Sequence, residues 1–157
     1  MNADASSDSA LKERIQDDIK AAMRAREKKH LGVLRLIGSE IKQREVDERI
    51  TLDDAAIVAV LDKMVKQRKD SLEQYQKAGR DDLANQESYE LTIIEPYLPA
   101  RVSAEELAQI LDQAFADVAP SSMKDMGKLM DMVKPQLQGR ADMGAVSKQV
   151  RERLTSL

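Results

Sequence analysis

The chain has 157 residues, of which 42% are hydrophobic and 34% are charged, and its formal net charge at pH 7 is −3. Such a composition supports a packed core, and the near-balance of charge argues against a generally cationic protein while leaving room for a local basic face. With no cysteine and one histidine, the sequence excludes thiol catalysis, disulfides, cysteine-based metal sites and a histidine-rich metal site.

Apolar residues recur at helical spacing along the chain. Ser9 is the predicted N-cap of a first helix, and the charged stretch at residues 24–29 is predicted to hold a turn. A second helix over residues 30–48 carries so many apolar residues that it should be the most buried helix of the N-terminal half. The side of this helix that is not apolar carries Arg35, Ser39 and Lys42, each about one turn after the one before.

Capping and stop residues also show where the third and fourth predicted helices begin and end. Thr51 and Asp54 have the spacing of a capping box, which predicts that a long third helix starts there. Gly79 should end this helix because glycine readily adopts the left-handed conformation of a C-cap. A fourth helix is predicted to begin near Asp81.

A domain boundary is predicted at Pro96 and Pro99, because two prolines within four residues stop a helix. The sequence therefore predicts an N-terminal helical subdomain of about four helices and a smaller C-terminal subdomain of three. The expected parts of the chain are a disordered polar tail at residues 1–8, a first subdomain at 9–97 and a second at 98–157.

Capping residues also mark the three helices of the second subdomain. Ser103 opens the fifth helix with a capping box, and Ser122 caps the sixth. Pro135 and Gly139 are predicted to end the sixth helix, and Asp142 to cap the last one. Because no alternating strand pattern is present, the predicted fold class is all-α.

Neither a secretory signal nor a membrane span is predicted. Residues 1–8 lack the basic start and apolar middle of a signal peptide. The longest apolar run, residues 55–61, is far shorter than the roughly 20 residues needed to cross a bilayer. We therefore expect a cytoplasmic protein that does not associate with membranes.

No motif for catalysis or cofactor binding is present. The chain has no glycine-rich phosphate loop, no paired-glycine dinucleotide motif and no Gly-x-Ser-x-Gly elbow. His30 lies beside two lysines at a helix start and is interpreted as a structural or surface residue. We therefore predict no catalytic residue, no metal site and no cofactor.

Three charged residues are predicted to point inward. On helical wheels, Arg68 falls within the apolar face of the third helix, and Glu87 and Glu90 fall on the apolar stripe of the fourth. An unpaired buried charge is costly, so Arg68 is expected to form an ion pair with Glu87 or Glu90. The alternative is that Arg68 binds an anionic ligand.

Basic residues are concentrated in two stretches. One is the segment at residues 63–69, and the other follows Asp117, where seven basic residues face four acidic ones. A basic patch suits contacts with nucleic-acid phosphates, but a solvated helix face has the same appearance in a sequence. Only four aromatic residues are present, so base recognition by rows of stacked rings is poorly supported.

Several segments resemble the YqeY-like proteins, in the expected order and over nearly the whole chain. The first, Leu34 to Lys42 (LRLIGSEIK), resembles the family's LR-x-I-x-S-x-IK segment. The second comprises KQRKDS at 66–71, Tyr75, AGR at 78–80 and Asp82-Leu83. The others are YLP at 97–99 followed by Ser103 and two glutamates, and DMGKLM at 125–130 followed by GRAD at 139–142.

This resemblance implies kinship with the helical tail of one component of the bacterial glutamyl/aspartyl-tRNA amidotransferase. In that enzyme the tail is an appendage that helps to grip tRNA, whereas the chemistry occurs elsewhere. The resemblance therefore implies a non-catalytic tRNA-binding module whose partners are tRNA and the amidation or aminoacyl-tRNA machinery.

Residues within or beside the matched motifs are the predicted nucleic-acid contacts, namely Lys124, Lys128, Arg140 and Lys148. Two alternatives remain open. The chain could be an accessory component of a glutamine-dependent amidotransferase, a carbon–nitrogen ligase, and count as an enzyme only within that complex. It could instead be a protein-interaction adaptor with no nucleic-acid role.

Overall fold

The computed structural model describes residues 9–157, and within them it contains α-helices and short 3-10 helices but no strand, which confirms the all-α prediction. The tail predicted at residues 1–8 lies outside the described residues. The elements are α1 (Ala10–Ala25), α2 (Lys28–Glu48), α3 (Asp54–Lys77), α4 (Asp81–Ile94), η2 (Glu95–Tyr97), α5 (Ala104–Val118), η3 (Met123–Asp125), α6 (Met126–Leu137) and α7 (Met143–Thr155).

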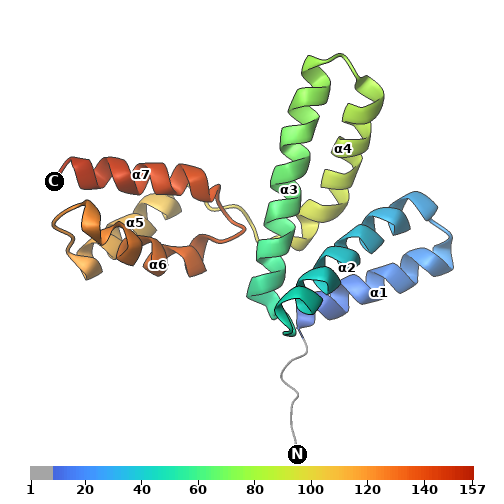
Figure 1. Ribbon diagram of the computed structural model, residues 1–157, viewed down its shortest axis with the longest axis horizontal. Helices are drawn as coiled ribbons and strands as arrows, with labels where there is room; N and C mark the ends of the chain where they lie inside the picture. The colour runs from blue at the N-terminus through green and yellow to red at the C-terminus, as the bar shows by residue number, and fades with distance from the viewer. Residues whose placement is uncertain (1–8) are drawn as a thin grey trace, which may run out of the picture. The chain divides into compact units, whose positions relative to one another are not determined.

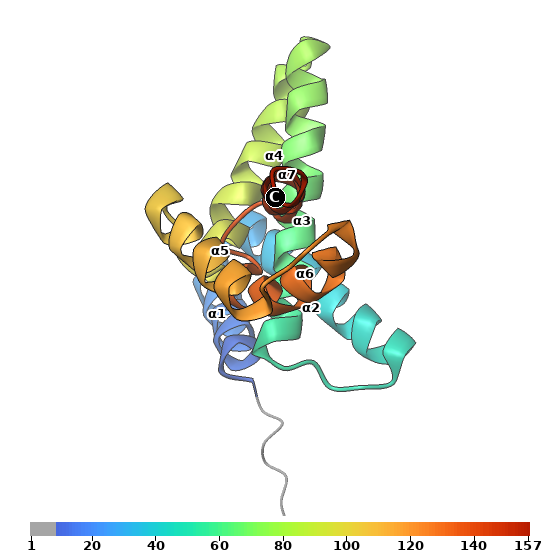
Figure 2. The same cartoon turned by 90° about the vertical axis from the view of Figure 1, so that its left-hand side faces the viewer.

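The chain divides into two compact units, one ending at Leu98 and the other comprising Pro99–Leu157. In the first unit, α1 and α2 form one helical hairpin and α3 and α4 form another, and the latter two run side by side in both views (Figures 1 and 2). The second unit consists of α5, α6 and α7.

Each unit has its own hydrophobic core. In the first, apolar faces from all four helices meet, and its most enclosed side chains include Leu34, Ile37, Ile57, Leu61 and Ile94. In the second, the three helices enclose residues that include Leu111, Leu129, Val133, Leu137 and Val150. Figure 2 looks nearly along α7, with α5 and α6 beside it.

The start of α3 differs from the sequence prediction. Its N-cap is Asp53, whose side chain accepts a hydrogen bond from the Ala56 amide, and not Thr51. Asp is a stronger N-cap than Thr, and a start at Asp53 puts Leu52 and Ile57 at the positions of a hydrophobic staple. Both side chains are buried in the core of the first unit, so packing selects the later start.

The end of α6 also differs. Pro135 does not end this helix but lies inside it, and the helix continues to Leu137. Proline at this position removes one backbone hydrogen bond, which is a smaller loss near a helix end than in its middle. Because Val133 and Leu137 are fully buried in the core, their packing outweighs that loss. The chain then turns at Gly139, whose φ is +79°.

Candidate nucleic-acid interface

The second unit carries a set of exposed basic side chains that have no ion-pair partner in the unit. Six of its basic side chains make no ion pair and no side-chain hydrogen bond in residues 99–157, all of which the structure describes. All six are exposed, and they are Arg101, Lys124, Lys128, Lys134, Lys148 and Arg151. A phosphate could therefore reach these cations without displacing a protein carboxylate.

Most acidic side chains of the same unit, in contrast, have protein partners. Five of its carboxylates are engaged: Glu106 with Arg140, Asp112 with Arg153, Asp117 with the Gln113 amide, and Asp125 and Asp142 with backbone amides. The sequence shows equal numbers of acidic and basic residues in this unit. In the structure, five of the eight carboxylates accept hydrogen bonds from protein groups, two of them within ion pairs, whereas six of the eight basic side chains make neither an ion pair nor a side-chain hydrogen bond.

Lys124 and Lys128 lie four residues apart in η3 and the start of α6, so they project on the same side. Asp125 lies between them, and its carboxylate accepts hydrogen bonds from the backbone amides of Ser121 and Ser122, at 2.8 and 3.4 Å. These bonds, that of Ser121 above all, and the charge of Lys128 lower the pKa of Asp125. The carboxylate thus serves as a cap for the turn.

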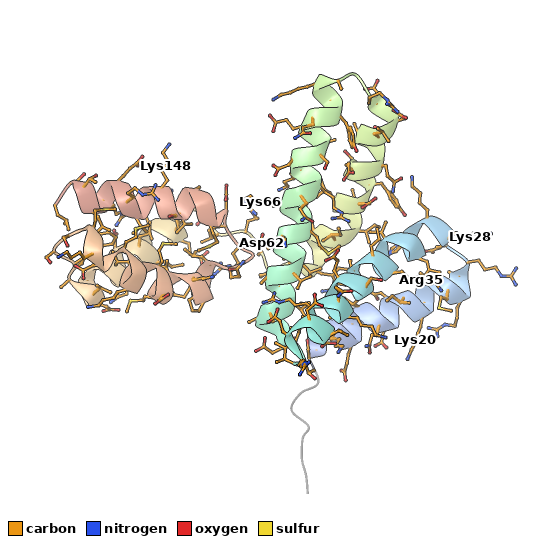
Figure 3. The ribbon with its side chains drawn as sticks, in the orientation of Figure 1. Lys20, Lys28, Arg35, Asp62, Lys66 and Lys148 are labelled. Atoms are coloured by element: carbon orange, nitrogen blue, oxygen red, sulfur yellow. The ribbon has the colours of Figure 1, made fainter. Side chains whose placement is uncertain are left out.

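Lys148 is exposed on the outer side of α7 (Figure 3). Its neighbours on the buried side of the helix are Val146 and Val150, which fix the orientation of the helix in the core. The rigid helix therefore holds the ammonium group in solvent.

Arg140, the fourth predicted contact, is tied into the unit itself. Its guanidinium donates to Glu106 Oε1 at 2.8 Å, to the Ala100 carbonyl at 3.0 Å and to the Gln136 carbonyl at 3.4 Å. Its own carbonyl accepts a hydrogen bond from the Val102 amide at 2.9 Å. We assign Arg140 to holding the segment that enters α5 against the end of α6, which leaves three predicted lysines for a ligand.

Three of the four aromatic rings are paired with cations of the chain. Lys29 Nζ lies 4.1 Å from the centroid of Tyr89, and the guanidinium carbon of Arg14 lies 4.7 Å from that of Tyr97. The guanidinium of Arg153, which also binds Asp112, lies over the ring of Phe115. These rings are engaged in the protein's own packing, so bases have little aromatic surface on which to stack.

In the first unit, Arg68 on α3 and Glu90 on α4 form an ion pair, with Arg68 Nε donating to Glu90 Oε1 at 2.9 Å. The side chains are 17% and 13% exposed, and Arg68 Nη1 also donates to the Met64 carbonyl at 3.3 Å. Glu87 lies half-buried close to this pair. The pair links the two helices of the α3–α4 hairpin and has the geometry of a structural contact.

The pKa of the Glu87 carboxyl is raised above its usual value of 4.5 by burial and by the negative charge of Glu90, partly offset by Arg68. The unfolded chain then releases this proton at lower pH than the folded chain, so stability falls as pH rises above about 4.5. We expect Glu87→Gln to remove this fall. Urea unfolding of both proteins from pH 4 to 7 measures this. The free energy of unfolding of Glu87→Gln, relative to that of the unmodified protein, should increase as pH rises. A pH-independent difference between the two proteins would contradict the assignment.

A cavity of about 400 Å³ in the first unit, lined by both apolar and polar side chains, has no counterpart among the sequence predictions. Its lining includes His30, which lies 3.7 Å from Glu27, and Tyr97, whose hydroxyl donates to Asp18. Burial and the Asp18 carboxylate raise the pKa of Tyr97. No local pattern could show this contact, because Asp18 and Tyr97 are 79 positions apart.

Within residues 9–157, no three histidine or carboxylate side chains lie close enough together to hold a metal ion. None of the described helices is long and apolar enough to cross a membrane.

Comparison with known proteins gives a consistent family match. A family model described as "Yqey-like protein" matches residues 12–154. The chain is 29% identical to "Altered inheritance of mitochondria protein 41, mitochondrial" of Pyrenophora tritici-repentis, over 88% of the chain and 78% of that protein. It is 37% identical to the protein of the same name in Eremothecium gossypii, over 62% of the chain and 55% of the relative. It is 40% identical to the protein of that name in Clavispora lusitaniae, over 57% of the chain and 52% of the relative. The chain therefore spans about half the length of these last two relatives.

The cytoplasmic location predicted from the sequence is contradicted by these relatives, which are named as mitochondrial proteins. The prediction was wrong because it depended only on the absence of two sequence features. The lack of a secretory signal and of a long apolar run does not distinguish one aqueous compartment from another.

Proposed function

This chain belongs to the YqeY-like family, and on that basis we propose that it is a non-catalytic helical module that binds folded tRNA through the second unit. Lys124, Lys128 and Lys148 contact phosphates in this proposal. The resemblance to the helical tail found in the tRNA amidotransferase suggests the class of nucleic acid. The chemistry of amide transfer belongs to other parts of that enzyme.

The observation that carries the proposal is a difference between the acidic and the basic side chains of residues 99–157: most of the acidic ones have protein partners, and most of the basic ones do not. Five of the eight carboxylates are held by hydrogen bonds from protein groups, whereas six of the eight cations are exposed and make neither an ion pair nor a side-chain hydrogen bond. Phosphate groups are the natural partners of such cations, and releasing their counterions drives the binding. The overall negative charge of the chain does not oppose this, because the local surface near a phosphate decides the interaction.

The engaged aromatic rings indicate how the tRNA is recognised. With three of four rings paired with cations of the chain, contacts to phosphate and sugar dominate over base stacking. Folded RNA is read largely by shape, so we expect weak dependence on the sequence of the tRNA.

The test compares the unmodified chain with Lys124→Ala/Lys128→Ala/Lys148→Ala in a tRNA gel shift at low salt. Losing three phosphate contacts should weaken binding about tenfold or more. Helicity should not change, because all three side chains are exposed.

The control is Arg44→Ala/Lys77→Ala/Arg80→Ala, which removes the same charge from three side chains of the first unit that each form an ion pair with a carboxylate of the chain. We expect this control to bind almost as well as the unmodified protein. Equal binding by the unmodified protein and the C-terminal triple variant would favour a protein-interaction adaptor instead.

A further inference from the structure

A line of unpaired cations also runs along the exposed side of α2 in the first unit. Lys28, Arg35 and Lys42 are seven residues apart, so successive side chains lie two turns or about 10 Å apart on nearly the same side of the helix. All three are exposed, and none has an ion pair or a side-chain hydrogen bond among residues 9–157. We call these three residues the α2 stripe.

No carboxylate interrupts the α2 stripe. Glu40 lies about 140° around the helix from Arg35. Glu45 accepts hydrogen bonds from Lys12 Nζ and from the Leu52 amide, both at 2.9 Å, and these bonds lower its pKa. Its charge is therefore balanced within the protein.

Two of the residues on this side of α2, Gly32 and Ser39, are small. A Cβ atom at Gly32 would meet nothing within 4 Å, and Ser39 lies exposed between Arg35 and Lys42. A backbone carrying phosphates can approach the helix closely at both positions.

The stripe continues toward α1. A groove of about 300 Å³ follows the seam between the helices, with Gly38 as its small residue on α2 and with Lys42 and Gln16 on its edges. Lys20 on α1 is a further exposed cation without an ion pair in the described chain, and Figure 3 shows it on the same hairpin as Lys28 and Arg35.

We infer that the α2 stripe is a second binding surface for the phosphodiester backbone of folded RNA. This inference rests on the proposed function and extends it, because it gives the first unit contacts to the same nucleic acid. A row of cations with small residues between them matches a chain of phosphates, each of which accepts a charge-assisted hydrogen bond.

An anionic membrane is the main competing polyanion, and the structure favours RNA. Membrane-bound amphipathic helices insert an apolar face below their basic residues. The apolar face of α2, with Val33, Leu34, Ile37 and Ile41, is instead buried in the core of the first unit.

The test is tRNA binding by the 157-residue chain carrying Lys28→Ala/Arg35→Ala/Lys42→Ala at several salt concentrations. We expect binding about tenfold weaker than that of the unmodified protein, and a salt dependence of log Kd lower by about 2–3 units of slope. Lys28→Arg/Arg35→Lys/Lys42→Arg, which keeps the charge, should bind normally. The control Arg44→Ala/Lys77→Ala/Arg80→Ala, in which each cation has a carboxylate partner in the chain, should also bind normally.

The outcomes separate this inference from the proposed function. If only the Lys124/Lys128/Lys148 variant loses binding, the α2 stripe is not an RNA surface, although the proposed function stands. Failure of the unmodified protein to bind tRNA overturns both. If the stripe variant keeps tRNA binding but loses binding to vesicles containing phosphatidylserine, the surface belongs to a membrane and the inference is wrong.

Discussion

Replacing Arg68 with alanine is expected to lower the free energy of unfolding of the first unit by about 2–3 kcal/mol. The substitution leaves Glu90, which is 13% exposed, without its charged partner next to the half-buried Glu87. It also removes the hydrogen bond to the Met64 carbonyl. Arg68→Lys should recover only part of the loss, because an ammonium cannot keep both contacts of the guanidinium. Urea unfolding followed by circular dichroism measures the effect.

Arg44→Ala is the matched control for Arg68→Ala. Arg44 also pairs with a glutamate, Glu48, but this pair is more exposed and lies within one helix. Such pairs contribute at most about 0.5 kcal/mol. Equal, small effects of the two substitutions would show that the Arg68–Glu90 pair adds little to stability and would favour the anion-binding alternative for Arg68.

Leu129→Ala is expected to have the largest effect on the second unit. Leu129 is fully buried at the centre of the three-helix core, and truncating such a leucine costs about 2–5 kcal/mol. This loss is comparable to the whole stability of a unit of this length. We expect α5, α6 and α7 to unfold well below the melting temperature of the first unit, with roughly a third of the helical signal lost in the earlier transition.

Met132→Ala provides the comparison on the same helix. Met132 is 38% exposed, so its truncation should change stability much less. A single transition in which the whole Leu129→Ala protein unfolds together would contradict the view that the units fold as separate domains.

The fold can be predicted well from the sequence because helices leave local signals. Ser9, Ser103 and Asp142 are recognisable as N-caps from residue type and spacing alone, and the structure confirms each of them. The errors occur where packing between distant residues decides the outcome. Leu52 selects Asp53 over Thr51 as a cap, and the burial of Leu137 carries α6 past Pro135.

The candidate site is harder to predict, because a sequence gives the number of charges but not their partners. Lys148 and Arg140 look alike in the sequence, yet Lys148 is exposed and unpaired whereas Arg140 binds Glu106 and two carbonyls. The pairing of Arg68 with an inward glutamate can be anticipated, since helical periodicity places both charges on apolar faces. The choice of Glu90 over Glu87 depends on geometry between two helices.

The most direct test of the proposed tRNA binding is its salt dependence in the unmodified chain. Lys124, Lys128 and Lys148 alone predict that log Kd rises with log salt concentration with a slope of about 2–3, because each phosphate contact contributes roughly one unit. A steeper slope is expected if the α2 stripe binds as well. Affinity that does not change with salt, or no binding of tRNA at low salt, would contradict the proposal.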